Sequence, residues 1–217
     1  MAETSLSTIG SRAVLFQAEC PFDLEHQQRF WAMADAAAAW PDVREAVPGM
    51  TNLTLLLDRV PDDLDRLAGR LTELWQTGLR KTVAGQLLEI DVRYGGTGGP
   101  HLADVAEMTG LSIDEVIRLQ SAPEYTVYAV GSHAGYCYLG GLDPRLETPR
   151  RKVPLTRLPG GSLSLAGLQA GVSASAGPSG WNTIGSADVR FFDPFRTPPS
   201  LLNPGDRVRF HPVEVAA

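Results

Sequence analysis

The residues best suited to chemistry lie in an irregular segment at residues 131–151. This segment holds four glycines, two prolines, two tyrosines and three arginines in a stretch too irregular for a helix. Glycine allows a backbone to approach a ligand closely, and the planar guanidinium group suits carboxylates and phosphates. The cluster of Arg145, Arg150 and Arg151 therefore predicts an anion-binding or partner-binding face, and the alternative is a solvated turn.

Other side chains in and after this segment extend the candidate site. His133 is a candidate general base because the reference pKa of histidine lies near neutrality, and a polar loop histidine without that role is the alternative. Gln169 lies in a glycine-rich stretch that could present its amide to a carbonyl or a carboxylate. Tyr138 and Trp181 could line a pocket or pack in a core. The catalytic candidates are thus His133 and Gln169, and the predicted substrate-binding residues are Tyr138, Arg145, Arg150, Arg151, Gln169 and Trp181.

Motifs for nucleotides and metals are missing from the sequence. A phosphate-binding loop ends in a lysine and a hydroxyl residue, and neither Lys81 nor Lys152 follows such a loop. The glycine run at residues 95–99 lacks the strand–loop–helix pattern, so we interpret it as a flexible linker. The four histidines are scattered and the two cysteines form no CxxC motif, so no metal site is expected.

The composition limits the classes of partner. The chain has 217 residues and a formal charge of −6, which gives it no general attraction to nucleic acid or to anionic membranes. No apolar run approaches the ~18–20 residues that cross a bilayer, and the first residues lack the features of a secretory signal. We therefore expect a cytoplasmic protein in which Cys20 and Cys137 are free thiols, although a disulfide between them stays open.

The pattern of residues 103–118 is similar to that of a DNA-binding helix-turn-helix, with two short helices joined at Gly110. A recognition helix must offer positive charge to phosphates. The second helix instead begins with Asp114 and Glu115 and carries Arg118 as its only base. We expect a helical hairpin that packs against the rest of the protein, and no nucleic-acid partner.

The elements that must position these residues divide into two parts. In the first part, strands and helices alternate in the order typical of a ferredoxin-like α/β sandwich. A glycine-rich run at residues 94–100 follows and predicts a domain boundary between residues 1–94 and 95–217. The expected elements of the first part are strands at 12–19, 43–47, 52–58 and 86–93 and helices at 23–40 and from 61 onward.

The second part begins with the helical hairpin, whose second helix carries the capping box Ser112 and Glu115. Short strands with turn residues every ~8–12 positions follow, and this spacing predicts a barrel or a sandwich. The expected strands lie at 125–130, 162–166, 182–186 and 207–211.

A series of short motifs runs through the second part of the chain, at residues 138–146, 149–151, 159–162, 166–167, 169, 171, 180–181, 184–185, 192–194, 198–199 and 204–210. The order of these motifs resembles the allophanate hydrolase subunit 1 family, which includes the 5-oxoprolinase B subunit and Kip-type inhibitors of a histidine kinase. The resemblance implies an α+β protein with an α/β N-terminal domain and a cyclophilin-like β-barrel C-terminal domain, in agreement with the elements above.

The resemblance also implies a function. Family members act with a homologous subunit 2, which in 5-oxoprolinase is the C-type subunit. In the commonest role a third subunit joins them in ATP-dependent opening of 5-oxoproline to glutamate. This implies a hydrolase subunit that is inactive alone, with ATP and Mg at a site shared with the partner. The alternatives are an allophanate hydrolase or urea amidolyase-type subunit 1, and a regulatory protein that inhibits a histidine kinase.

The chain departs from the family pattern at three places. Residues 133–136 read HAGY where the family usually reads APGF, and residues 169–174 read QAGVSA where it usually reads QTGIYP. Residues 177–181 read GPSGW in place of SPGGW. The hydroxyl at position 170 and the aromatic ring at position 173 are thus lost, which leaves an altered substrate or a weakened activity open.

Overall fold

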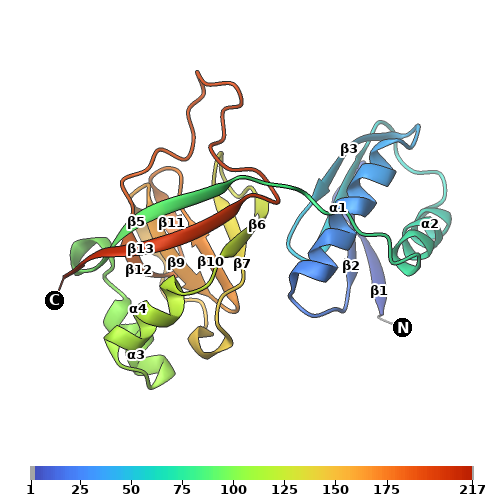
Figure 1. Ribbon diagram of the computed structural model, residues 1–217. Helices are drawn as coiled ribbons and strands as arrows, with labels where there is room; N and C mark the ends of the chain where they lie inside the picture. The colour runs from blue at the N-terminus through green and yellow to red at the C-terminus, as the bar shows by residue number, and fades with distance from the viewer. Residues whose placement is uncertain (1–2, 217) are drawn as a thin grey trace. The chain divides into compact units, whose positions relative to one another are not determined.

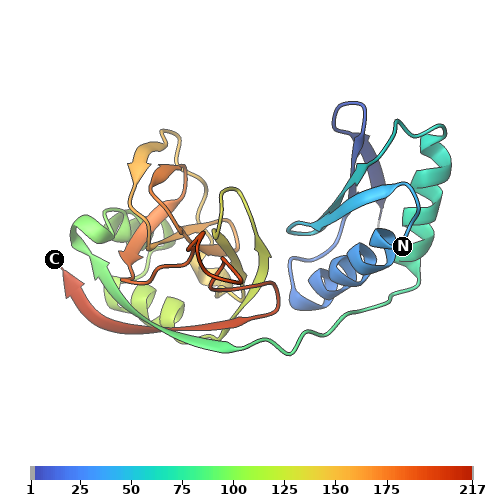
Figure 2. The same cartoon turned by 90° about the horizontal axis from the view of Figure 1, so that it is seen from above.

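The computed structural model describes residues 3–216 and divides the chain into two compact units between Thr82 and Val83 (Figure 1). The boundary lies upstream of the predicted position after residue 94. The reason is that β5 (Leu87–Gly95) pairs with β12 (Asn182–Ser186) and β13 (Arg207–Ala216), so it belongs to the second unit. An extended segment joins α2 (Leu64–Gln76), the last helix of the first unit, to β5 (Figure 2).

The first unit is a two-layer α/β sandwich around an antiparallel sheet with the strand order β1-β2-β4-β3. The predicted ferredoxin-like class is confirmed, with one change. The edge beside β2 is occupied by β1, a strand that the prediction missed, and not by residues 86–93. The elements of this unit are β1 (Thr4–Thr8), β2 (Ala13–Ala18), α1 (Leu24–Ala38), β3 (Val43–Pro48), β4 (Asn52–Leu57) and α2 (Leu64–Gln76).

Alternation and helix capping explain how this unit forms. Strand β4 alternates buried leucines with partly exposed residues, and its leucines share one core with side chains of both helices. Each helix begins after an aspartate whose carboxylate accepts a hydrogen bond from a backbone N–H at 2.9 Å, Asp23 from His26 and Asp63 from Arg66.

The second unit is a closed barrel of seven strands in the order β10-β7-β6-β13-β5-β12-β9, which confirms the predicted barrel. The prediction missed the short strands β7, β8, β10 and β11. Strands β8 and β11 pair with each other outside the barrel. The remaining strands of this unit are β6 (Tyr125–Val130), β7 (Cys137–Gly140), β8 (Leu155–Leu158), β9 (Ser162–Ala166), β10 (Gln169–Val172) and β11 (Gly177–Ser179).

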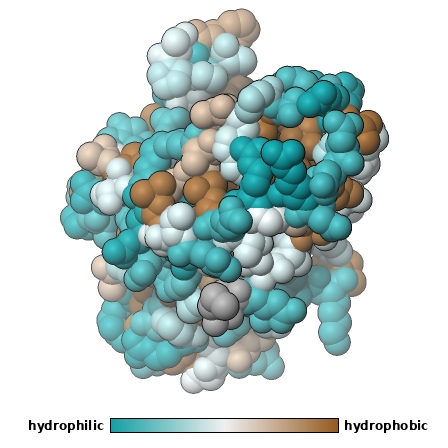
Figure 3. Space-filling model, turned by 90° about the vertical axis from the view of Figure 1, so that its right-hand side faces the viewer, coloured by the Kyte–Doolittle hydropathy of each residue, from teal (hydrophilic) through white to brown (hydrophobic). Residues whose placement is uncertain are grey.

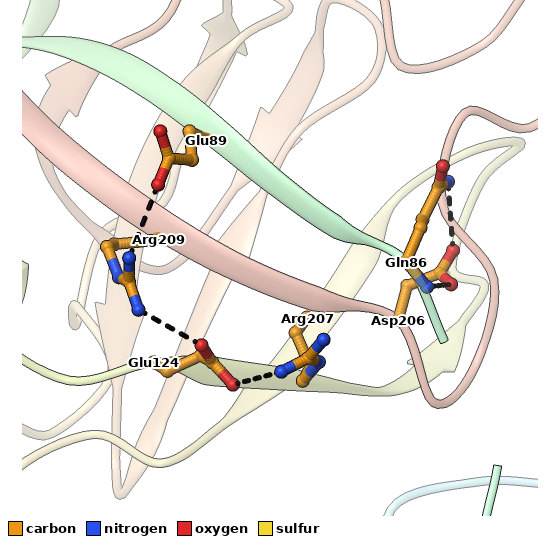
Figure 4. Close-up of polar contacts among 6 residues, drawn as sticks. All are labelled: Gln86, Glu89, Glu124, Asp206, Arg207 and Arg209. Carbon is orange, nitrogen blue, oxygen red and sulfur yellow. Dashed lines mark hydrogen bonds and ion pairs between the residues drawn. The ribbon is translucent and has the colours of Figure 1, made fainter. Parts of the chain in front are cut away.

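Polar contacts fix the parallel pairing of β5 with β13 (Figure 4). The buried carboxylate of Asp206 accepts hydrogen bonds from the backbone N–H of Gln86 at 2.9 Å and of Asn203 at 2.8 Å. Farther along the pair, Arg209 joins Glu89 at 3.3 Å to Glu124 at 3.2 Å. Asp206 therefore sets where β5 starts against β13.

A helical hairpin of α3 (Leu102–Thr109) and α4 (Ile113–Ser121) packs on the barrel, as predicted. The expected capping box is present: Ser112 and Glu115 exchange side-chain-to-backbone hydrogen bonds. The glycine run before the hairpin is not the flexible linker that we expected. A methyl group at Gly95 would overlap the carbonyl oxygen of Ala216, and one at Gly99 that of Ile184, so both glycines permit close backbone packing.

The surface in Figure 3 shows apolar residues as separate patches among hydrophilic ones, which is ordinary for a folded protein. Within residues 3–216, no helix combines the length and the apolar character that crossing a membrane requires. Both cysteines are free: Cys20 is partly buried and Cys137 is buried, and burial raises the pKa of each thiol.

Candidate functional site

The barrel unit contains a cavity of about 250 Å³ with a strongly polar lining. Aromatic rings, serine hydroxyls and one guanidinium group surround it. The lining residues are Ser132, His133, Tyr136, Tyr138, Arg150, Leu158, Ser164, Ser173, Gly177, Pro178, Ser179, Gly180 and Trp181.

Strand alternation directs two of these side chains into the cavity. On β7, Cys137 and Leu139 belong to the barrel core, so Tyr138 between them points to the other side. On β9, Ser164 lies in the same way between two leucines of the core. Leu158 belongs to β8 and residues 177–179 form β11, and the loops between strands supply the other lining residues, among them His133, Arg150 and Trp181.

Four aromatic rings form one wall of the cavity through edge-to-face contacts. The ring centroids of His133 and Tyr136 lie 5.1 Å apart, those of Tyr136 and Tyr138 4.7 Å, and those of Tyr138 and Trp181 5.9 Å. Such contacts hold each ring in one orientation. Burial raises the pKa of Tyr136, so its hydroxyl keeps its proton and serves as a hydrogen-bond donor. Gly171 leaves the space for this ring, because a methyl group there would overlap the Tyr136 hydroxyl.

The side-chain hydrogen bond of His133 defines which ring nitrogen carries a proton. Its Nε2 lies 3.4 Å from the hydroxyl oxygen of Ser173, and Ser173 donates its own hydrogen to the carbonyl of Ser175 at 2.8 Å. The serine oxygen can therefore only accept from the imidazole, so Nε2 carries a proton. Burial lowers the pKa of His133, which favours the neutral ring with a bare Nδ1.

The charge of the cavity comes from Arg150. It is the only arginine or lysine among the lining residues, and none of them is an aspartate or a glutamate. The guanidinium carbon of Arg150 lies 5.9 Å from the ring centroid of Trp181, within cation–π range. A single unopposed cation beside hydroxyls and aromatic rings suits a small ligand that carries one anionic group.

Known proteins are similar to this chain in sequence along nearly its whole length. The family model described as carboxyltransferase domain, subdomain C and D, matches residues 4–202. The 5-oxoprolinase B subunit from Escherichia coli O157:H7 is 43% identical over 205 residues, which is 94% of each chain. The protein of the same name from Bacillus subtilis is 32% identical over 94% of this chain and 91% of its own length. The chain belongs to the 5-oxoprolinase B-subunit family.

Solved structures agree with this family. The protein TTHA0988 is 36% identical with a TM-score of 0.74, over 94% of this chain and 40% of its own. This chain thus spans less than half the length of that protein. The protein PH0987 from Pyrococcus horikoshii is 34% identical with a TM-score of 0.58, over 97% and 98% of the two chains. The Kluyveromyces lactis urea amidolyase reaches a TM-score of 0.80 at 16% identity, over 97% of this chain and 15% of its own, which shows the shared fold alone.

In this member of the 5-oxoprolinase B-subunit family, the fold brings together some of the sequence-predicted residues and separates others. His133, Tyr138, Arg150 and Trp181 line one cavity. Gln169 is the first residue of β10 and pairs with Ala166 outside the lining.

Two of the three predicted arginines lie outside the cavity lining. Arg145 turns back onto Asp143, with contacts of 3.0 and 2.7 Å, and lowers the pKa of that carboxyl to about 2. Arg151 reaches Asp104 of α3 at 3.3 Å, and its backbone N–H donates to the carbonyl of Gly180 at 2.8 Å. Arg150 and Arg151 are adjacent in the chain, but their side chains lie in different places. Arg150 lines the cavity, whereas Arg151 pairs with α3.

Sequence reasoning missed Ser164 as a lining residue, and it noted position 173 only for the loss of the family's aromatic ring. Ser164 had a usable signal, because it lies between two leucines in a strand and must face away from them. Its hydroxyl lies 3.0 Å from that of Thr183. Ser173 follows β10, and only the fold brings it to His133.

Proposed function

We propose that this chain is the substrate-binding subunit of a 5-oxoprolinase complex, which opens the lactam 5-oxoproline to glutamate with consumption of ATP. The names of relatives that match about 94% of the chain support the reaction. The single observation that carries a binding role is the cavity with one arginine, no carboxylate and an aromatic wall.

The substrate fits the chemistry of this cavity. 5-Oxoproline is a five-membered lactam that bears one carboxylate, and it is small enough for a cavity of about 250 Å³. In our proposal Arg150 binds the carboxylate through paired hydrogen bonds. The rings of Tyr138 and Trp181 flank the flat lactam, and cavity hydroxyls such as that of Ser164 bond to its amide.

The cavity does not fit ATP. Its lining offers one guanidinium group to three phosphates and no carboxylate to Mg²⁺. Within residues 3–216, no group of three histidine, cysteine or acidic side chains is placed to hold a metal ion. We therefore propose that the nucleotide site is completed by a partner subunit.

The partners follow from the same proposal. The relatives are named as the B subunit of an enzyme, which implies that the enzyme has further subunits. We propose a homologue of the C-type subunit and a third, lactam-hydrolysing subunit. An unstrained lactam resists water, so activation of its carbonyl oxygen is needed, and this chain contributes by binding and orienting the ring.

The test is to purify the chain with both partner subunits and to measure ATP hydrolysis that depends on 5-oxoproline. Arg150→Gln is expected to lower kcat/KM at least about tenfold, because the carboxylate loses its charged partner. Arg145→Gln is the matched control, since Arg145 lies outside the lining and its loss leaves the cavity intact. An assembled complex without turnover would refute the proposed reaction.

A further inference from the structure

The first unit contains a second cavity, of about 260 Å³, which the proposed function does not use. It lies where the end of α1 and the start of α2 meet the strands β3 and β4. Its lining residues are Trp40, Pro41, Asp42, Val43, Leu57, Arg59, Pro61, Asp62, Asp63, Arg66, Leu67 and Arg70.

The floor of this cavity is apolar. Leu57 is buried, with 4% of its surface exposed, and Val43 and Leu67 are partly buried against the same core. The indole of Trp40 forms one side and is itself partly exposed. An apolar side chain that entered the cavity would cover this surface.

The rim of the cavity carries both signs of charge, but two of its acids already have partners. The carboxylate of Asp42 holds Arg59 through contacts of 3.1 and 3.2 Å. The carboxylate of Asp63 caps α2 by accepting from the backbone N–H of Arg66. The hydrogen bond to Asp42 and the charge of Asp42 raise the pKa of Arg59, and the charge of Asp62 adds to the shift.

The guanidinium groups of Arg66 and Arg70 are left with no carboxylate partner within residues 3–216. They lie one helical turn apart on α2, a like-charged pair that weakens a helix slightly. The Arg70 guanidinium stacks on Trp40, with its central carbon 3.8 Å from the ring centroid. Stacking fixes the plane of the group and leaves its N–H edge available for an acceptor.

We propose that this cavity binds a peptide segment of another protein in which a carboxylate stands next to an apolar side chain. The carboxylate pairs with Arg66 and Arg70, and the apolar side chain packs on Trp40 and Leu67. The charged lining residues are exposed, so the cavity is open to solvent along its rim. A peptide side chain with a carboxylate beside it matches the apolar floor and the two unpaired guanidinium groups at the same time.

The experiment titrates the full-length protein with N-acetyl-Leu-Leu, which has a terminal carboxylate beside a leucine side chain. The indole N–H signals of Trp40 and Trp181 report on the two cavities separately. The Trp40 signal is expected to saturate with a dissociation constant of about 1 mM, as a contact this small allows. The C-terminal amide of the same peptide is expected to bind about tenfold more weakly.

Variants test whether Arg66 and Arg70 are responsible for the binding reported at Trp40. Arg66→Gln and Arg70→Gln are each expected to weaken the binding reported at Trp40 about tenfold. Arg44→Gln, an exposed arginine of the same unit outside the lining, is the matched control and is expected to bind like the original protein. Arg150→Gln alters only the barrel cavity, so its effect on turnover tests the proposed function and not this site.

Three results would overturn the proposal. They are the lack of a saturable change at Trp40 up to about 10 mM peptide, equal binding of acid and amide, and binding that Arg66→Gln and Arg70→Gln leave unchanged. Binding of the free acid 4-methylpentanoate as tight as that of the peptide would also overturn it, because the site would then take small acids.

Discussion

The Nε2 atom of His133 lies 3.4 Å from the hydroxyl oxygen of Ser173, and the hydroxyl hydrogen of Ser173 is directed to the carbonyl of Ser175. The serine oxygen therefore accepts from the imidazole, and one ring proton lies on Nε2, on the serine side. Burial lowers the pKa of the ring and so favours the neutral form, in which Nδ1 is bare.

Burial of His133 predicts a pH dependence of stability. A histidine whose folded pKa lies below its unfolded value of about 6.5 binds fewer protons when folded, so it destabilises the fold as pH falls through that value. The unfolding free energy should be highest above about pH 6.5 and decline toward about pH 5. Urea unfolding of the original protein and of His133→Gln checks this, and the variant should show a shallower decline.

His101 contributes to the same decline, since burial and then the charge of Arg151 lower its pKa. His101→Gln therefore serves as the comparison. In both variants the unfolding free energy should decline less steeply with falling pH than it does in the original protein. An unchanged slope in His133→Gln would show that its imidazole is not held neutral.

The next prediction concerns the space beneath the aromatic wall. A methyl group at Gly171 would overlap the Tyr136 hydroxyl and lie 3.0 Å from the Trp181 ring. Gly171→Ala should displace these rings, cost about 1–3 kcal/mol of stability, and weaken 5-oxoproline binding. Urea unfolding and tryptophan fluorescence measure both effects. Gly131→Ala is the control, because its methyl group would meet nothing within 4 Å, and equal behaviour of the two variants would contradict the prediction.

Sequence patterns could predict the elements whose signals are local. The leucines of β4 alternate, and the capping box at Ser112 is complete within four residues, so both were predicted correctly. Strand β1 was missed because it is short and polar, and only Leu6 packs against the core. The domain boundary was misplaced because the pairing that puts β5 in the barrel joins it to β13, far along the chain.

In the candidate site, too, local sequence signals predicted some features, and others depend on contacts between distant parts of the chain. Residue types made Tyr138 and Arg150 candidates, because aromatic and guanidinium groups are typical of binding sites, and both residues line the cavity. The pattern could not tell that Arg145 and Arg151 face Asp143 and Asp104 instead. Side-chain direction in an irregular loop depends on contacts that only the fold creates.

The neighbouring arginines give a prediction that separates binding from local structure. Arg151→Gln removes one partly exposed ion pair with Asp104 and should cost about 0.5–1 kcal/mol, without a large change in 5-oxoproline affinity. Asp104→Asn should cost a similar amount, and the double variant should cost less than the sum of the two. A tenfold loss of affinity in Arg151→Gln would place that side chain in the site instead.

The last prediction concerns the closure of the barrel by Asp206. This buried carboxylate accepts from the backbone N–H groups of Gln86 and Asn203, and the Gln86 side-chain amide donates to it at 3.3 Å. Asp206→Ala leaves these donors unpaired, so we expect a loss of about 3 kcal/mol in urea unfolding, because hydrogen bonds to charged groups are strong. Amide exchange at Gln86 and Asn203 should accelerate in the folded protein.

Glu89→Gln, which weakens an exposed pair with Arg209, is the control and should cost less than about 1 kcal/mol. If both variants lost the same small amount, the register of β5 against β13 would depend on the backbone ladder and not on Asp206.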